Sequence, residues 1–125
     1  MGASENIATA KRGFAAFAAG DAAAAMTDLT DDIEWVTPGN SAIGGTTHGK
    51  QELGANWAKL AEKGFTTSPQ YWFADEERVV VLTQISVGGE TADSVDVLTF
   101  NADGKVTRFQ SAGDTALFER VFGSQ

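Results

Sequence analysis

The apolar residues near the start of the chain recur every three or four positions, as they do on one face of a helix: Ile7, Ala10, Phe14 and Phe17. This spacing predicts a helix over residues 4–19, with Ser4 as its N-cap and Gly20 as its end. Asp21 is suited to cap a second, alanine-rich helix that runs to about Leu29. The chain is therefore predicted to begin with two successive helices.

The next segment mixes strand and helix signals. Residues 33–37 are rich in β-branched and aromatic side chains and are followed by Pro38, so they predict a strand. The polar residues 30–32 before it predict a turn that connects the second helix to this strand. Residues 44–49 are rich in glycine and predict a loop. A third helix, ended by Gly64, is predicted by an apolar stripe made of Leu53, Trp57, Leu60 and Ala61.

From residue 65 onward the apolar period changes to two, which is typical of strands. The turns between them are short and rich in glycine, asparagine and aspartate, so successive strands are expected to pair antiparallel. Asp114 is expected to cap a last short helix. The predicted strands cover residues 66–74, 78–87, 91–100 and 105–112.

This order of elements predicts an α+β fold. Each predicted helix has one apolar stripe, so a layer of helices must cover one face of a curved sheet. The fourteen glycines fit such curvature, because bent strands need bulges and close backbone approaches. No linker or repeat divides the sequence, and residues 1–125 are predicted to form a single domain.

Charge and hydropathy limit the classes of partner. Seventeen acidic and nine basic residues give a net charge of −8, which repels phosphate backbones, so nucleic acid is not an expected partner. No apolar run approaches the roughly 20 residues of a membrane span, so no membrane partner is expected either. These features favour a cytoplasmic location.

The chain has little material for metal or cofactor chemistry. It has no cysteine, and its single histidine, His48, has no neighbours at metal-ligand spacing, so no metal site and no cofactor are predicted. The pKa of an imidazole would suit a general base. The position of His48 in a His-Gly turn before a helix favours a structural role.

Four landmarks follow one another along the chain: Gly20-Asp21, the segment 30–35, His48-Gly49-Lys50 and the segment 94–106. In this order and spacing they resemble the nuclear transport factor 2-like superfamily, and within it the SnoaL-like polyketide cyclases and ketosteroid-isomerase-like proteins. The resemblance covers nearly the whole chain. It implies a cone-shaped, cystatin-like roll, with three N-terminal helices packed on a curved, mostly antiparallel sheet around an apolar pocket.

The same resemblance implies how such a domain is used. It implies a small apolar ligand of polyketide, steroid or terpenoid type, and a homodimer formed through the open face of the sheet. Alternating strands such as residues 78–87 could supply an apolar face for that dimer.

The catalytic groups of these relatives match this chain only in part. Where the isomerases have an aspartate base before the proline that ends the first strand, this chain has Thr37, whose hydroxyl cannot be that base. Their oxyanion-donating tyrosine matches about Gly13, and the acid/base aspartate of the cyclases matches Ser111. Their protonated strand aspartic acid matches Asp96, which the resemblance therefore implies as an acid or oxyanion donor.

The residues themselves also single out Asp96. It alternates with Ser94, Leu98 and Phe100, and burial on a pocket-facing side would raise the pKa of its carboxyl. The alternatives are a solvated face or an ion pair with Arg78 or Arg108. Besides Asp96, the residues expected to contact a ligand are Phe14, Phe17, Trp35, Thr37, Trp57, Ser94, Leu98, Phe109 and Ser111.

Some of these residues have plainer interpretations. Aromatic residues at these spacings also fit an ordinary core. Asp114 could be an acid at the mouth of the pocket, but its place before a helix favours a cap. Three hypotheses stay open: an isomerase or cyclase that uses acid/base chemistry, a binding module that has lost the catalytic base, and an interaction or dimerisation domain.

Overall fold

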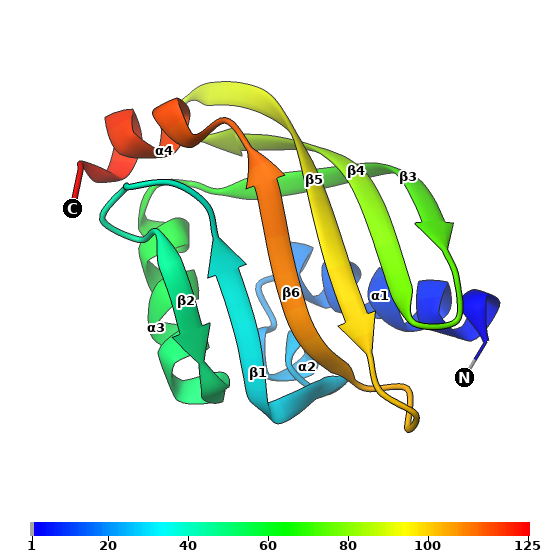
Figure 1. Cartoon of the computed structure of the whole chain (residues 1–125). Coiled ribbons are helices and arrows are strands. Elements are labelled where there is room, and N and C mark those ends of the chain that lie inside the picture. Colours follow the sequence, from blue (N-terminus) through cyan, green and yellow to red (C-terminus); the bar gives the residue numbers. More distant parts are fainter. Residues whose placement is uncertain (1) are drawn as a thin grey trace.

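A curved six-stranded sheet is the frame of this computed structural model, which describes residues 2–125 (Figure 1). The strand order is β2-β1-β6-β5-β4-β3. β1 and β6 are parallel and every other neighbouring pair is antiparallel. The strands are β1 (Leu29–Thr37), β2 (Gly45–His48), β3 (Thr66–Ala74), β4 (Arg78–Val87), β5 (Glu90–Phe100) and β6 (Val106–Gly113).

Local irregularities accompany the curvature of the sheet. The register shifts between Pro69 and Tyr71 in β3 and between Thr99 and Phe100 in β5. A third shift separates Leu29 from Glu34 in β1. An extra residue in one strand bends that strand and increases its twist, so these shifts help to give the sheet a concave and a convex face.

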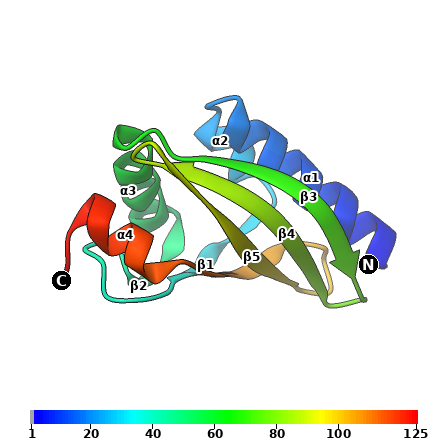
Figure 2. The ribbon, with the colours of Figure 1, turned by 90° about the horizontal axis from the view of Figure 1, so that it is seen from above.

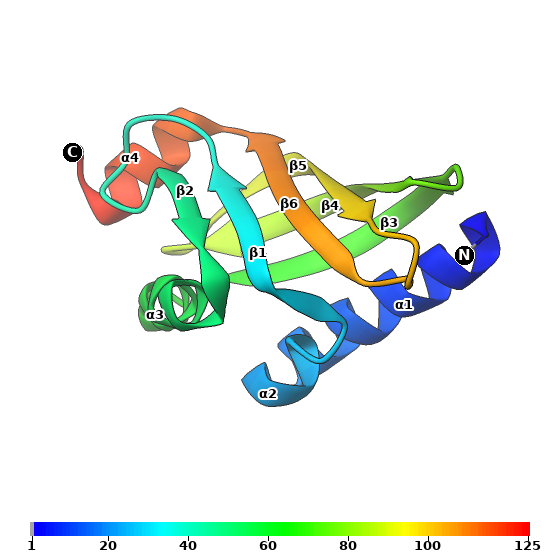
Figure 3. The ribbon, with the colours of Figure 1, turned by 60° about the horizontal axis from the view of Figure 1, so that its bottom comes forward.

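The helices gather on the concave side and at one end of the sheet: α1 (Ala3–Ala18), α2 (Ala22–Ala25), α3 (Gly49–Glu62) and α4 (Thr115–Phe122). Figures 2 and 3 show α1 and α3 on the same side of the sheet. α4 packs near the turn between β4 and β5, where its Leu117 forms a small core with Ile85 and Val87. Within residues 2–125, no helix is long and apolar enough to cross a membrane.

The main core lies between the concave face and the helices. Ile33 of β1, Leu53 of α3 and Val79 of β4 are completely buried and belong to the same apolar cluster. Ala10 brings α1 into this cluster, and Phe109 brings in β6. Contacts from α1 and α3 and from β1, β4 and β6 therefore hold the concave surface in place.

The period-two signal located the strands of the meander well. The predictions for residues 66–74 and 78–87 coincide with β3 and β4, and those for β5 and β6 differ from the observed bounds by one residue. Ile33, Trp35 and Thr37 share the concave face as the alternation predicted.

Two predictions in the middle of the chain were wrong. Residues 30–32, expected to form a turn, are part of β1, where Leu29 pairs with Val106 of β6. Residues 45–48, expected in a loop, form β2, which pairs with residues 34–37 of β1. Residues 45–48 are extended because they pair with β1, and residues 30–32 because they lie between the pairs that Leu29 and Glu34 make with β6. The side chains of both segments are mostly polar and exposed.

The helix ends agree in part with the predictions. Asp21 and Asp114 are N-caps as predicted, each accepting a 3.0 Å hydrogen bond from a backbone N–H in the first turn of its helix. Ser4 is not a cap, because α1 begins at Ala3 and the Glu5 carboxylate accepts a hydrogen bond from Gly2 N. α2 ends at Ala25 rather than near residue 29. The three helices predicted at the N-terminus are therefore α1, a single-turn α2 and α3, and α4 makes a fourth.

The turn between β4 and β5 consists of Gly88 and Gly89, which have positive φ angles of 59° and 81°. Such angles suit glycine because a Cβ atom is disfavoured in the left-handed region. A Cβ on Gly88 would lie 2.7 Å from Cγ2 of Val121 in α4, whereas one on Gly89 would meet nothing within 4 Å. The two glycines thus share a backbone constraint but differ in packing.

We expect Gly88→Ala to destabilise the fold more than Gly89→Ala. Both variants carry the cost of about 1–2 kcal/mol for an alanine in left-handed conformation, but only the methyl group added at position 88 also pushes against Val121. The free energies of unfolding, measured by urea denaturation, test this. In a Val121→Ala background the difference between the two variants should shrink, and equal losses in the native background would contradict the expectation.

Candidate functional site

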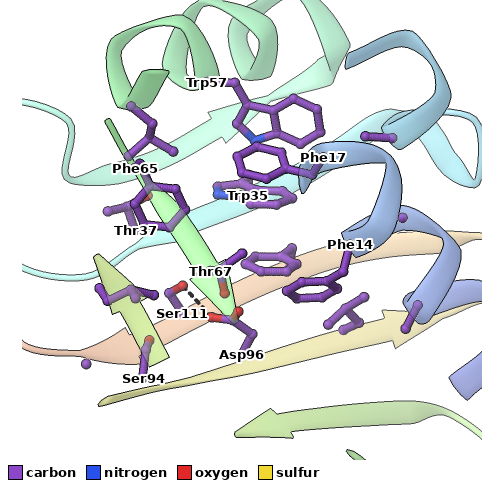
Figure 4. Close-up of a pocket in the computed structure, with 18 of the residues that line it drawn as sticks. Phe14, Phe17, Trp35, Thr37, Trp57, Phe65, Thr67, Ser94, Asp96 and Ser111 are labelled. Carbon is purple, nitrogen blue, oxygen red and sulfur yellow. Dashed lines mark hydrogen bonds between the residues drawn. The ribbon is translucent and has the colours of Figure 1, made fainter. Parts of the chain in front are cut away.

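A cavity with an empty volume of about 1050 Å³, including its part open to solvent, lies between the concave face and the helices (Figure 4). Its lining is mainly apolar, as is usual for small-molecule pockets. The structure brings together at this cavity every residue that the sequence singled out for ligand contact: Phe14, Phe17, Trp35, Thr37, Trp57, Ser94, Asp96, Leu98, Phe109 and Ser111.

Aromatic rings form one continuous wall of the cavity. Trp35 of β1 and Phe109 of β6 are opposite each other in the parallel pair, and their rings stack with centroids 3.7 Å apart and planes 4° apart. Trp57 of α3 stands edge-on to Trp35 at 5.5 Å and to Phe17 of α1 at 5.1 Å. Phe14 extends the wall along α1 at 6.3 Å from Phe109. This wall offers flat apolar surface to a ligand.

Phe65 and Phe118 also line the cavity, whereas several other aromatic residues lie away from it. Tyr71 and Phe73 are 60% and 57% exposed and belong to the convex side of β3. Trp72 packs edge-on against Phe14 at 5.3 Å without lining the cavity, and Phe100 is buried in the core. The alternation of β3 therefore divides its aromatic residues between two faces.

Asp28, Asp96 and Asp114 line the cavity, and among these described carboxyl groups only that of Asp96 belongs to a buried residue. Asp96 is only 5% exposed, and its Oδ1 accepts a 2.7 Å hydrogen bond from Oγ of Ser111. Burial raises the pKa of Asp96 to about 6, although the hydrogen bond from Ser111 acts in the opposite direction. The arginines considered as alternative partners, Arg78 and Arg108, pair with glutamates instead.

Two hydroxyl groups on the same face as Asp96, those of Thr67 and Thr83, were not predicted from the sequence. Thr67 of β3 lines the cavity, and its Oγ1 lies 2.6 Å from Oγ1 of Thr83 in β4. A signal for Thr83 was present, because a two-residue turn at residues 88–89 sets the register that places Thr83 opposite Ser94. The contact of Thr67 with Thr83 is diagonal, because Thr67 pairs with Ile85 and Thr83 pairs with Pro69. This register depends on a shift in β3 and has no local signal.

The remaining candidates have limited chemical roles. Thr37 is 6% exposed at the end of β1 and contributes a hydroxyl to the wall. Gly13, which matches the tyrosine of the isomerases, lines the cavity without a side chain. Asp114 also lines it, but its carboxylate caps α4. His48 is exposed and ends β2, outside the cavity lining.

The indole of Trp57 carries a buried donor. Its Nε1 has no hydrogen-bond partner within the described part of the chain, and it stands beside the rings of Phe17 and Trp35 (Figure 4). As to metal ions, residues 2–125 contain no group of three or more His, Asp or Glu side chains arranged to hold one.

Comparison with solved structures identifies similar folds. The chain is 24% identical to Bal32a from a soil-derived mobile gene cassette, with a TM-score of 0.87 over 96% of this chain and 98% of that one. It is 29% identical to an NTF2-like protein from Burkholderia xenovorans LB400, with a TM-score of 0.82 over 98% of each chain. It is 28% identical to TerC, solved with polyporic acid, with a TM-score of 0.84 over 96% of this chain and 99% of TerC.

Comparison of the sequence gives the family. No curated protein matches the chain. A family model described as a SnoaL-like domain matches residues 10–109, which contain most of α1, the aromatic wall and the carboxyl of Asp96. The match covers most of the chain, and the neighbouring structures share its NTF2-like fold. This chain therefore belongs to the SnoaL-like domain family.

Proposed function

We propose that this protein binds a small, flat, apolar molecule in its cavity and that Asp96 exchanges a proton with that molecule. The observation that carries the proposal is a buried carboxyl group, 5% exposed, in a cavity walled by stacked aromatic rings. Burying a carboxyl in apolar surroundings is unfavourable for folding, so its presence in a cavity is characteristic of a functional group.

The shape and chemistry of the wall support the ligand class. The stacked pair of Trp35 and Phe109 and the edge of Trp57 offer apolar area that a planar ring system can cover. Polyketide, steroid and terpenoid skeletons have this character. The similarity to TerC, solved with polyporic acid, makes that compound a suitable first probe.

The pKa of Asp96 suits proton transfer near neutral pH. A carboxyl with a pKa of about 6 is mainly ionised at pH 7, so it can accept a proton, and it is mainly protonated below pH 6. Ser111 donates to Oδ1, which leaves Oδ2 for a ligand. In an isomerisation, Oδ2 would take the proton from a carbon next to a carbonyl group and return it to another carbon of the same molecule.

A binding protein without catalysis is the alternative. The positions that match the base and the tyrosine of the isomerases are Thr37 and Gly13, and neither can act as a base or stabilise an enolate with a phenol. In that case the cavity would hold its ligand, and Asp96 would only accept a hydrogen bond from it.

Ligand binding is expected to raise the melting temperature of the protein. A thermal-shift screen should cover polyporic acid, steroids, aromatic polyketides and terpenoid epoxides, because a ligand at about 100 times its dissociation constant stabilises the folded state by about 2.7 kcal/mol. No shift with any class would contradict the proposal.

Proton exchange by a bound ketone is expected to depend on Asp96. Deuterium uptake at the carbon next to its carbonyl, followed by NMR in D₂O, should fall at least tenfold in Asp96→Asn. Asp93→Asn is the matched control, because Asp93 lies on the same strand with an exposed side chain on the opposite face. Binding with no protein-dependent uptake in the wild type would favour the binding protein over the enzyme.

Asp96→Asn is also expected to stabilise the protein at pH 8. The native pKa of Asp96 lies above its unfolded value near 3.8, so the native state binds more protons between these two values. The wild type therefore loses stability as pH rises from about 4 to about 6, and asparagine avoids this loss, which is worth roughly 1–3 kcal/mol. Urea denaturation of both proteins from pH 4 to 8 measures the difference, and a less stable variant at pH 8 would contradict it.

We also propose that the convex face of the sheet forms a homodimer. Two rows of apolar side chains cross neighbouring strands there. The registers place Tyr71 beside Leu82 and Val95, and the second row joins Phe73, Val80 and Val97. Tyr71, Phe73 and Leu82 are the large apolar side chains that remain exposed among the described residues. A contiguous apolar surface of this kind favours a self-complementary contact.

Phe73→Glu is expected to convert the dimer into a monomer. A carboxylate in the apolar row would have to be desolvated in the interface, and the side chain is 57% exposed, so the fold itself should survive. Sedimentation velocity gives the mass of each species. Thr66→Glu, an exposed position at the far end of β3, is the control. A monomeric wild type would refute the dimer.

A further inference from the structure

A band of polar side chains crosses the otherwise apolar concave face. Thr83 of β4 is opposite Ser94 of β5, and Asp96 of β5 is opposite Ser111 of β6. Thr67 of β3 extends the band by its contact with Thr83. Figure 4 shows Thr67, Ser111 and Asp96 with their oxygen atoms turned toward the same part of the cavity. Polar groups in such surroundings need hydrogen-bond partners, so each proton in the band can be accounted for.

The burial of Thr83 decides which hydroxyl donates the hydrogen bond between Thr67 and Thr83. Their oxygens are 2.6 Å apart, and either hydroxyl could be the donor by distance alone. Thr83 is 3% exposed, and within residues 2–125 its hydroxyl has no other hydrogen-bond partner. If Thr67 donated, the proton of Thr83 would be buried without an acceptor, which is costly. Thr83 therefore donates to Thr67.

This direction leaves the proton of Thr67 free. Thr67 is partly exposed, and it lines the cavity. Its oxygen accepts from Thr83, which holds the hydroxyl in place, and its own O–H has no acceptor in the described part of the chain. The hydroxyl is thus a positioned donor on the cavity wall, on a different strand from Asp96.

We propose that Thr67 donates a hydrogen bond to an acceptor oxygen of the ligand while Asp96 interacts with a proton-bearing group of the same molecule. This inference rests on the proposed function of the cavity and narrows its ligand class. The ligand is an apolar ring compound with a carbonyl or ether oxygen for Thr67 and a hydroxyl group or acidic C–H bond for Asp96. A pure hydrocarbon of the same shape would use neither group.

Two probes of equal shape test the role of Thr67. 2-Acetylnaphthalene has a carbonyl oxygen, 2-isopropenylnaphthalene has a CH₂ group in its place, and the dissociation constants of both can be measured by equilibrium dialysis at pH 7.5. Thr67→Val keeps the β-branched shape and removes the hydroxyl. We expect it to weaken binding of the ketone about 3- to 10-fold, as for the loss of one neutral hydrogen bond, and to leave binding of the hydrocarbon within twofold.

Thr67→Ser restores a hydroxyl and is expected to recover most of the affinity for the ketone. Thermal melting of each variant shows that the fold is intact. If Thr67→Val weakens both probes equally, or neither, the inference is overturned while the proposed cavity function stands. If neither probe binds the wild type, that result counts against the cavity function and overturns the inference with it.

Thr83→Val tests the direction of the bond. With Thr83 as the donor, its removal leaves the proton of Thr67 where it was and loosens the orientation of that hydroxyl, so affinity for the ketone should stay the same or fall by up to about threefold. If Thr67 were the donor instead, the substitution would release its proton and affinity for the ketone would rise. A rise would overturn the inference.

Discussion

The parallel pairing of β1 with β6 is the contact on which the rest of the molecule depends. In the strand order this pairing joins the β2–β1 pair to the meander formed by β3, β4, β5 and β6. It places Trp35 opposite Phe109, and the stacking of these rings at 3.7 Å makes the centre of the cavity wall. β2 pairs with β1 and α3 follows β2 directly, so the same junction also joins Trp57, which lies beside Trp35, to the part of the wall that Phe109 forms. Without it, Trp35 and Trp57 would be separated from Phe109 and the aromatic wall would be broken.

Strand β5 shows how one sheet serves two surfaces. Ser94, Asp96 and Leu98 line the cavity, whereas Val95 and Val97 point to the convex side. The period of two assigns alternate residues to opposite faces, so a ligand site and an apolar outer surface can share a backbone. Because each face has its own side chains, the proposed ligand site and the proposed dimer surface use different residues of β5.

The concave face combines stabilising and destabilising groups. Apolar burial along β4 and β5 stabilises the fold, whereas Asp96 and the hydroxyl groups around it reduce that gain unless each is hydrogen-bonded. Ser111 donates a hydrogen bond to Asp96, and Thr83 is hydrogen-bonded to Thr67. The partners are side chains on adjacent strands, so these hydrogen bonds hold the polar band in place. Oδ2 of Asp96 and the hydroxyl of Thr67 remain available to the cavity. A site built on strands in this way is held more firmly than one built on loops.

Much of this arrangement was present in the sequence, and the rest was decided by tertiary structure. Local periodicity determined β3 and β4, the caps at Asp21 and Asp114, and the face of Asp96, because each depends on residues within a few positions of one another. β2 and the start of β1 have no such pattern, since β2 is extended because it pairs with β1, and residues 30–32 because the pairs on either side of them hold β1 against β6. The stack of Trp35 on Phe109 and the pairing of Thr67 with Thr83 join separate strands, and only the folded sheet brings those strands into register.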